Sequence, residues 1–220
     1  MSGLQFDVAH MLAGGLVLLS FVLLYQDRLS ALIKVFALHA TTLSAAVAWQ
    51  AYVRDAPHLY VTALVALALK AAVIPLALDR LVRRLGLHRD VEPIVGIGPT
   101  MLAGIGLVAL AMVVMLKVTP EADRLAREDL AFALSIVLLG LLMMITRRNA
   151  VSQAIGFLSL EDGLVLAATG AHGMPLVIEV SVAFSVLVAF IVISVFLLRI
   201  RERFDSVDVE VIGRYRGARR

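Results

Sequence analysis

The sequence predicts an all-α, polytopic membrane protein with seven transmembrane helices, and three observations lead to that fold class. The 220 residues are 61% hydrophobic but only 6% aromatic, so the apolar character comes from aliphatic side chains. This content exceeds what a water-soluble domain of this size needs. Seven apolar segments are each long enough to cross a bilayer. The basic residues, finally, fall between these segments rather than on one face, which argues against nucleic-acid binding despite a pI near 9.6.

The seven predicted spans are separated by short polar or proline-bearing breaks such as "YQDR", "RDAPH" and "RRN". We place the spans near residues 4–25, 29–53, 57–82, 94–118, 130–147, 151–171 and 175–199. The short turns after the first, fifth and sixth spans predict antiparallel neighbours in contact.

The distribution of basic residues predicts the orientation of the chain in the membrane. With the N-terminus outside, fifteen basic residues fall on the inner side and four on the outer side, and Lys70, the last of the 20, lies inside a span. This positive-inside bias predicts an external N-terminus and, with seven spans, a cytoplasmic C-terminus.

Four units follow along the chain: the first three helices (1–90), the fourth helix with an outer loop (91–129), a three-helix unit (130–203) and a cytoplasmic tail (204–220). "YQDRLSALIKVF" in the first unit mirrors "TRRNAVSQAIGF" near the third. A diverged repeat would explain this likeness, and the sequence alone leaves that interpretation open.

Ionisable groups inside the spans are the candidate functional residues. Placing such a group at mid-bilayer costs about 2.5–3.5 kcal/mol on insertion scales, so it should face protein or water. The candidates for a proton relay are His39, Lys70, Glu161, Asp162 and Glu179. The chain contains no cysteine, H-E-x-x-H motif or nucleophile elbow. We therefore expect no catalytic, cofactor or metal site within it.

Each candidate has a structural alternative. Lys70 could bond to carbonyls that Pro75 frees in its own helix, or it could carry protons, and a carboxylate partner on another helix would favour the second. Glu161 could form a structural ion pair or act as a relay station. Asp162 points about 100° away around the helix, so Glu161 is expected to be the working carboxyl. A lone membrane histidine such as His39 is often an interhelical hydrogen bonder.

Glu179 follows Pro175 by four residues, near the predicted outer surface. It could be an exposed carboxylate at a helix start or a group at the mouth of a channel.

The stretch "RRNAVSQAIGFLSLEDG" resembles the K-type small subunit of respiratory complex I and the C-type subunit of Mrp antiporters. In those families an Arg/Asn-bearing turn and an "IG" pair lead into a helix with a buried glutamate. Arg147, Arg148 and Asn149 match the turn, and Ile155 and Gly156 match the pair. Glu161 follows Gly156 by five residues rather than two, which keeps the helix face but shifts the depth by about 4.5 Å.

Over nearly its whole length, the chain resembles hydrogenase-4 component E through "LYVTALVALALKAAVIPLALDR" and "VEPIVGIGPTML". The resemblance implies a subunit of a membrane-bound [NiFe] hydrogenase or formate hydrogenlyase-like complex in a bacterial or archaeal cytoplasmic membrane. It would lie beside antiporter-like subunits and contribute to proton (or sodium) translocation. The [NiFe] centre and iron–sulfur clusters would belong to partner subunits.

Two other functions compete with this interpretation. A scaffold subunit of an Mrp-like or other complex I-like membrane arm would have its polar groups merely paired. A retinal photoreceptor would suit the topology, but the predicted seventh helix contains no lysine for a Schiff base.

Overall fold

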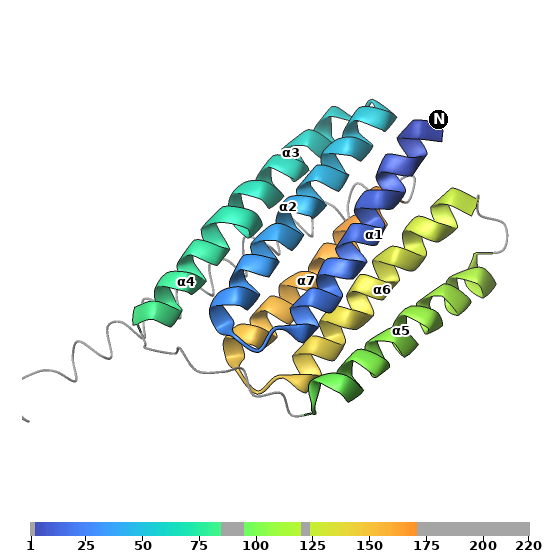
Figure 1. Cartoon of the computed structure of the whole chain (residues 1–220). Helices are drawn as coiled ribbons and strands as arrows, with labels where there is room; N and C mark the ends of the chain where they lie inside the picture. Colours follow the sequence, from blue (N-terminus) through green and yellow to red (C-terminus); the bar gives the residue numbers. More distant parts are fainter. Residues whose placement is uncertain (1–2, 85–94, 120–123, 171–220) are drawn as a thin grey trace, which may run out of the picture.

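The computed structural model describes residues 3–84, 95–119 and 124–170, and these form a bundle of helices (Figure 1). The elements are α1 (Gly3–Tyr25), α2 (Leu29–Arg54), α3 (Pro57–Ala66), the π-helix η1 (Leu67–Val73), α4 (Ile74–Arg84), α5 (Ile97–Val118), α6 (Arg124–Thr146) and α7 (Ala150–Gly170). Helices α3, η1 and α4 follow one another without a break. The all-helical prediction is confirmed for this part of the chain.

Six helices in the described ranges are long and apolar enough to cross a membrane, with α3, η1 and the start of α4 acting as one span. Their bounds agree with the first six predicted spans to within a few residues, except at α6. That helix begins at Arg124, inside the predicted outer loop, because helical hydrogen bonding continues into the polar residues before the apolar run. The predicted seventh span, with Glu179, and the predicted tail lie outside the described residues.

Helix α7 occupies the most enclosed position in the bundle. The helices α3, α2, α1, α6 and α5 lie side by side in that order, and α7 packs behind them against α2 and α6 (Figure 1). Of the six spans, α7 is the most buried and α5 the least. Polar groups on α7 are therefore held among protein side chains rather than facing lipid.

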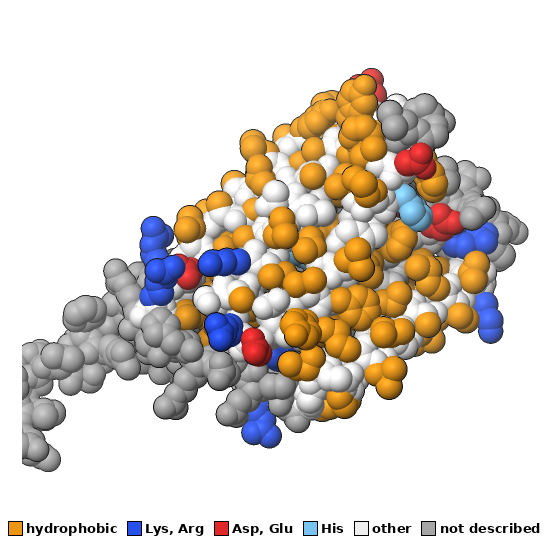
Figure 2. Space-filling view, in the orientation of Figure 1, with side chains coloured by type: hydrophobic (Ala, Val, Ile, Leu, Met, Phe, Trp, Pro, Cys, Tyr) orange, Lys and Arg blue, Asp and Glu red, His pale blue; other side chains and the backbone are white. Residues whose placement is uncertain are grey.

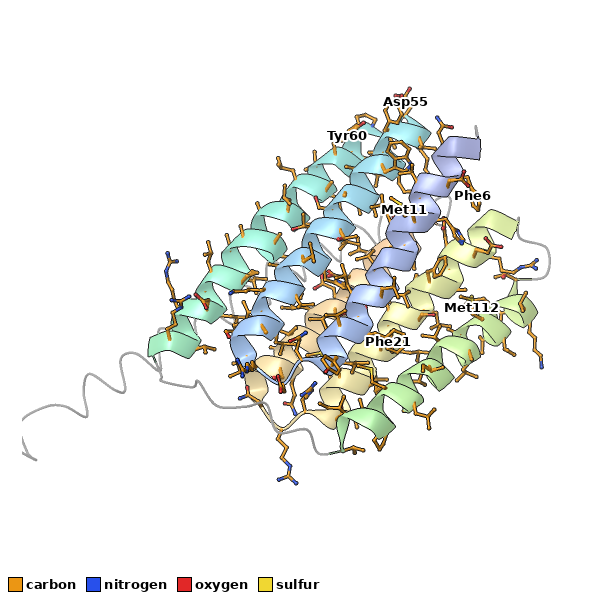
Figure 3. The ribbon with its side chains drawn as sticks, viewed as in Figure 1. Phe6, Met11, Phe21, Asp55, Tyr60 and Met112 are labelled. Carbon is orange, nitrogen blue, oxygen red and sulfur yellow. The ribbon has the colours of Figure 1, made fainter. Side chains whose placement is uncertain are left out.

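Glycines bring α6 and α7 into backbone contact. A Cβ atom on Gly140 would lie 2.6 Å from the backbone nitrogen of Leu160, and one on Gly163 would lie 2.8 Å from the Ala133 carbonyl oxygen. Small residues allow this close approach of membrane helices. By contrast, Phe21 of α1, labelled in Figure 3, fills the space beside Gly104 of α5.

The turn before α7 is fixed by a buried arginine rather than held at the surface. Arg147 is 1% exposed and donates a hydrogen bond to the Leu24 carbonyl at the end of α1, whereas Arg148 is exposed. Burial lowers the pKa of Arg147, partly offset by Asp27. The Asn149 side chain accepts a hydrogen bond from the Val151 amide at 2.8 Å, which satisfies one free amide of the first turn of α7.

Charged side chains lie mainly at the two ends of the bundle, and apolar ones cover the length between them (Figure 2). Lys and Arg side chains gather at the end where α4 finishes, while the opposite end carries acidic, histidine and some basic side chains (Figure 2). Met11 of α1 and Tyr60 of α3 extend away from the bundle (Figure 3) and are among the exposed large apolar residues. This banded surface is the one expected of a bilayer-spanning bundle.

Candidate functional site: a buried charged cluster

Lys70 reaches the interior from a wide turn of helix. The residues Leu67–Val73 form a π-helix, in which the Ile74 amide bonds the Leu69 carbonyl five residues back. Pro75 lacks an amide hydrogen, so an α-helical register would leave a carbonyl of this turn without a donor. The wider register accommodates that loss, as π-turns do beside prolines in membrane helices. Lys70 lies at the centre of this segment and is 1% exposed.

The Lys70 ammonium contacts both carboxyl groups of α7. Its Nζ lies 2.6 Å from Asp162 Oδ1 and 3.2 Å from Glu161 Oε2. Both carboxyls are almost wholly buried. Asp162 therefore shares a partner with Glu161, because a long lysine side chain can bridge two residues that are adjacent on one helix. That Glu161 is the working carboxyl stays a prediction. The alternative in which Lys70 bonds to freed carbonyls of its own helix gives way to an ion pair between helices.

His39 of α2 extends the cluster toward α1. Its Nδ1 lies 2.9 Å from Asp162 Oδ2, and its Nε2 lies 3.1 Å from the hydroxyl oxygen of Ser20. The Ser20 hydroxyl also lies 2.9 Å from the carbonyl oxygen of Leu16, one turn earlier in α1. Asp162 thus has one carboxylate oxygen on Lys70 and the other on His39. We refer to Ser20, His39, Lys70, Glu161 and Asp162 as the charged cluster.

The hydrogen bonds of the charged cluster can be satisfied in two ways, and the first has both ring nitrogens of His39 as donors. Ser20 has a single hydroxyl hydrogen, and if it donates to the Leu16 carbonyl, then His39 Nε2 must donate to Ser20. Asp162, beside an ammonium group, is a carboxylate and accepts from His39 Nδ1. All these contacts are made together when His39 is an imidazolium. Two cations then balance two carboxylates, and the cluster is neutral, which is the favourable condition for buried charges.

The second arrangement has one proton fewer and keeps the contacts of His39 with Asp162 and Ser20. A neutral His39 with hydrogen on Nδ1 still donates to Asp162, and Ser20 can turn its hydroxyl from Leu16 to Nε2. Lys70, Glu161 and Asp162 then carry a net charge of −1. The two arrangements differ by one proton and by the rotation of one hydroxyl group.

The charged cluster lies near the middle of the predicted membrane span. Lys70 is about 20 Å from Pro57 and about 15 Å from Arg80 at 1.5 Å per residue. Among the described residues, no group of His, Asp and Glu side chains has the arrangement of a metal site. The site pairs two basic side chains with two acidic ones.

Four of the five predicted relay residues meet at this site: His39, Lys70, Glu161 and Asp162. That these residues relay protons stays a prediction. The fifth predicted residue, Glu179, lies outside the described residues. Ser20 was missed, because a serine in an apolar helix usually bonds its own backbone and carries no separate sequence signal.

A comparison with curated proteins finds a relative along the whole chain. The Mycobacterium tuberculosis protein named "Uncharacterized protein Rv0085" is 32% identical over 222 residues, covering 98% of this chain and 100% of the relative. No protein-family profile matches the chain. No solved structure matches it either.

Proposed function

This chain belongs to the same protein family as the mycobacterial protein Rv0085, and we propose that it is a proton-translocating subunit of a larger membrane complex. The observation that carries the proposal is the charged cluster, in which side chains from four helical segments form one buried network of hydrogen bonds and ion pairs. An ionisable group within a membrane span is a functional candidate by default. Here four such groups contact one another.

The contacts favour the proton over sodium as the transported ion. A sodium ion would need several oxygen ligands, but the nearest carboxylate oxygens already accept hydrogen bonds or an ion pair from Lys70 and His39. A cation at Asp162 would lie beside the ammonium group, where like charges repel strongly in a medium of low dielectric constant. A proton requires none of these contacts to be broken.

The larger complex is proposed from the resemblance of the sequence to hydrogenase-4 component E. On this proposal the chain has seven spans, an external N-terminus and a cytoplasmic C-terminus, and lies in a bacterial or archaeal cytoplasmic membrane. Its neighbours are antiporter-like subunits of a complex I-related arm. The [NiFe] centre and iron–sulfur clusters belong to partner subunits that carry out the redox chemistry.

A scaffold role is the second candidate, and one observation favours it. Asp162 is held at both of its oxygens, so the cluster could serve only to fix α2, η1 and α7 relative to one another. Buried polar groups can specify which helices pair without carrying protons.

Substitution of the two adjacent carboxyls separates these functions. Glu161→Gln keeps the shape and a hydrogen bond but cannot release a proton at neutral pH. We expect the complex to assemble and proton translocation in inverted membrane vesicles to fall by about 100-fold, the lower end of what a positioned proton-transfer group contributes. Full translocation by Glu161→Gln would refute the relay role of this carboxyl.

Asp162→Asn is the matched comparison on the next residue. It weakens the contacts with both Lys70 and His39, and breaking a buried ion pair typically costs about 3–5 kcal/mol. We therefore expect a lower yield of assembled complex, measured in the same membranes. If both variants reduce assembly equally and leave translocation per complex unchanged, the scaffold role is the correct one.

A further inference from the structure

Two basic side chains at the end of the bundle where α4 finishes are exposed and form no ion pair with any described residue. They are Lys34 of α2 and Arg80 of α4. Arg83, one turn further along α4, is by contrast paired with Asp79 at 2.8 Å. Lys and Arg side chains gather over this end of the bundle (Figure 2). Lys34 and Arg80 are therefore available to an anion from outside the chain.

Lys34 and Arg80 lie at nearly the same depth on two helices in contact. Helix α2 and the continuous run of α3, η1 and α4 are joined by the turn between Arg54 and Pro57, and α2 contacts α4. Lys34 precedes Arg54 by 20 residues and Arg80 follows Pro57 by 23, so both are roughly 30–35 Å from that turn. This distance is about the thickness of the hydrocarbon core of a bilayer. Both charges therefore reach the level of the lipid headgroups on one side of the membrane.

An exposed leucine lies one helical turn deeper than each of these basic residues. Leu38 follows Lys34 by four residues and is 54% exposed, and Leu76 precedes Arg80 by four and is 53% exposed. Residues four apart lie on the same face of a helix. Each helix thus presents a cation at the headgroup level and an apolar side chain at the level of the acyl chains.

We propose that Lys34 and Arg80 together bind the phosphate of one anionic phospholipid, whose acyl chains lie along Leu38 and Leu76. A guanidinium group donates two hydrogen bonds to phosphate oxygens, and an ammonium group adds a compact positive charge. Basic sites at the ends of membrane helices recognise anionic headgroups in this way. A zwitterionic headgroup brings a cation of its own, which both side chains repel. The inference does not depend on the proton-relay proposal.

Helix α5 offers a matched control at the opposite end of the bundle. In the α4 run, an exposed alanine, an exposed apolar residue and an exposed basic residue follow one another at intervals of four, namely Ala72, Leu76 and Arg80. The same exposed series occurs on α5 as Ala109, Val113 and Lys117. On the neighbouring helix α6, Arg127 donates to the Thr119 carbonyl at 2.9 Å, so it is not available as Lys34 is. Lys117 is therefore expected to act alone.

Fluorescence quenching by brominated lipids measures which lipid lies beside each series. Ala72→Cys and Ala109→Cys would be made singly in the full chain, which has no cysteine, and labelled with bimane. The protein, with any subunits that co-purify, is reconstituted in vesicles of phosphatidylglycerol and phosphatidylcholine. Only one of the two lipids carries brominated acyl chains in each preparation, at the same mole fraction.

Beside Ala72→Cys, we expect phosphatidylglycerol to be preferred over phosphatidylcholine by about 30-fold, since each basic residue near the surface contributes about fivefold. Lys34→Gln or Arg80→Gln alone should lower the preference to about fivefold, and the double variant should abolish it. Beside Ala109→Cys the preference should be no more than about fivefold. Unchanged quenching of this second label in the double variant shows that the protein is still folded and inserted.

Three results would overturn the lipid site. The first is an equal preference at the two labels, or a preference at Ala72→Cys that survives the double substitution. The second is quenching of Ala109→Cys but not of Ala72→Cys by both lipids, because a protein subunit would then cover this face. The third is loss of the preference in millimolar inorganic phosphate at constant ionic strength, which would assign the two basic residues to a soluble anion.

Discussion

Protonation of His39 is the residue-level property on which the neutrality of the charged cluster depends. The Ser20 hydroxyl lies within hydrogen-bond distance of the Leu16 carbonyl, and in the neutral arrangement of the cluster both ring nitrogens of His39 are donors. We expect the ¹⁵N spectrum of histidine-labelled protein at neutral pH to show His39 with both nitrogens protonated. The signal is assigned by its loss in His39→Gln. A nitrogen resonance of the unprotonated type for His39 would contradict the imidazolium assignment.

Among individual residues, the sequence identified which ionisable side chains form the site, but not which of them contact one another. A lysine, a histidine and two carboxyls stand out in apolar segments because each is costly to insert. Their mutual contacts depend on where four helical segments come together, which a single sequence does not contain. The 100° offset argument separated Glu161 from Asp162, yet Lys70 contacts both because its side chain is long and flexible.

At the scale of the helices, the contact between α6 and α7 depends on glycines, which have no side chain to hold the two backbones apart. A methyl group on Gly140 would meet the Leu160 backbone, which cannot give way as a flexible side chain can. We expect Gly140→Ala to destabilise the bundle by about 1–3 kcal/mol, the usual cost of overpacking. Gly106→Ala on α5 is the control, since its added methyl would meet nothing within 4 Å.

The thermal stability of the two variants in detergent measures this difference. Gly106→Ala should melt at or slightly above the temperature of the parent protein, because alanine favours the helix more than glycine does. Gly140→Ala should melt several degrees lower. Equal melting temperatures would mean that α6 and α7 can separate without cost, and the placement of Glu161 and Asp162 would then need another explanation.

The positions of the helices along the chain were the most predictable feature of the fold. Local departures from α-helical geometry were the least predictable. Apolar length alone gave the first six spans, because the bilayer thickness fixes how long each helix must be. The π-helix at Leu67–Val73 was not predicted, although Pro75 was recognised as a source of freed carbonyls. Whether a proline kinks a helix, leaves an unpaired carbonyl or widens a turn is decided by packing against neighbouring helices.

At the scale of the whole molecule, the mid-membrane polar groups and the absence of a recognisable catalytic motif in the sequence lead us to expect stable partners. The protein should co-purify with other membrane subunits after extraction in a mild detergent. Mass spectrometry of the purified complex, with a tagged unrelated membrane protein from the same cells as the control, measures this. A monodisperse single-chain species that translocates protons when reconstituted alone would contradict the subunit proposal.

The orientation of the bundle is predicted by the distribution of its charges. Basic residues dominate the end that carries Arg148, so that end should face the cytoplasm, and the turn that carries His58 should face outward. Arg148→Cys and His58→Cys place single thiols at these two exposed positions in a chain without cysteine. An impermeant maleimide should label His58→Cys in intact cells or spheroplasts and Arg148→Cys only in inverted vesicles. Labelling of both thiols from one side would mean that an even number of spans separates them, or that one of the intervening helices, α3 to α6, does not cross the membrane. The reverse pattern would keep the bundle but invert it.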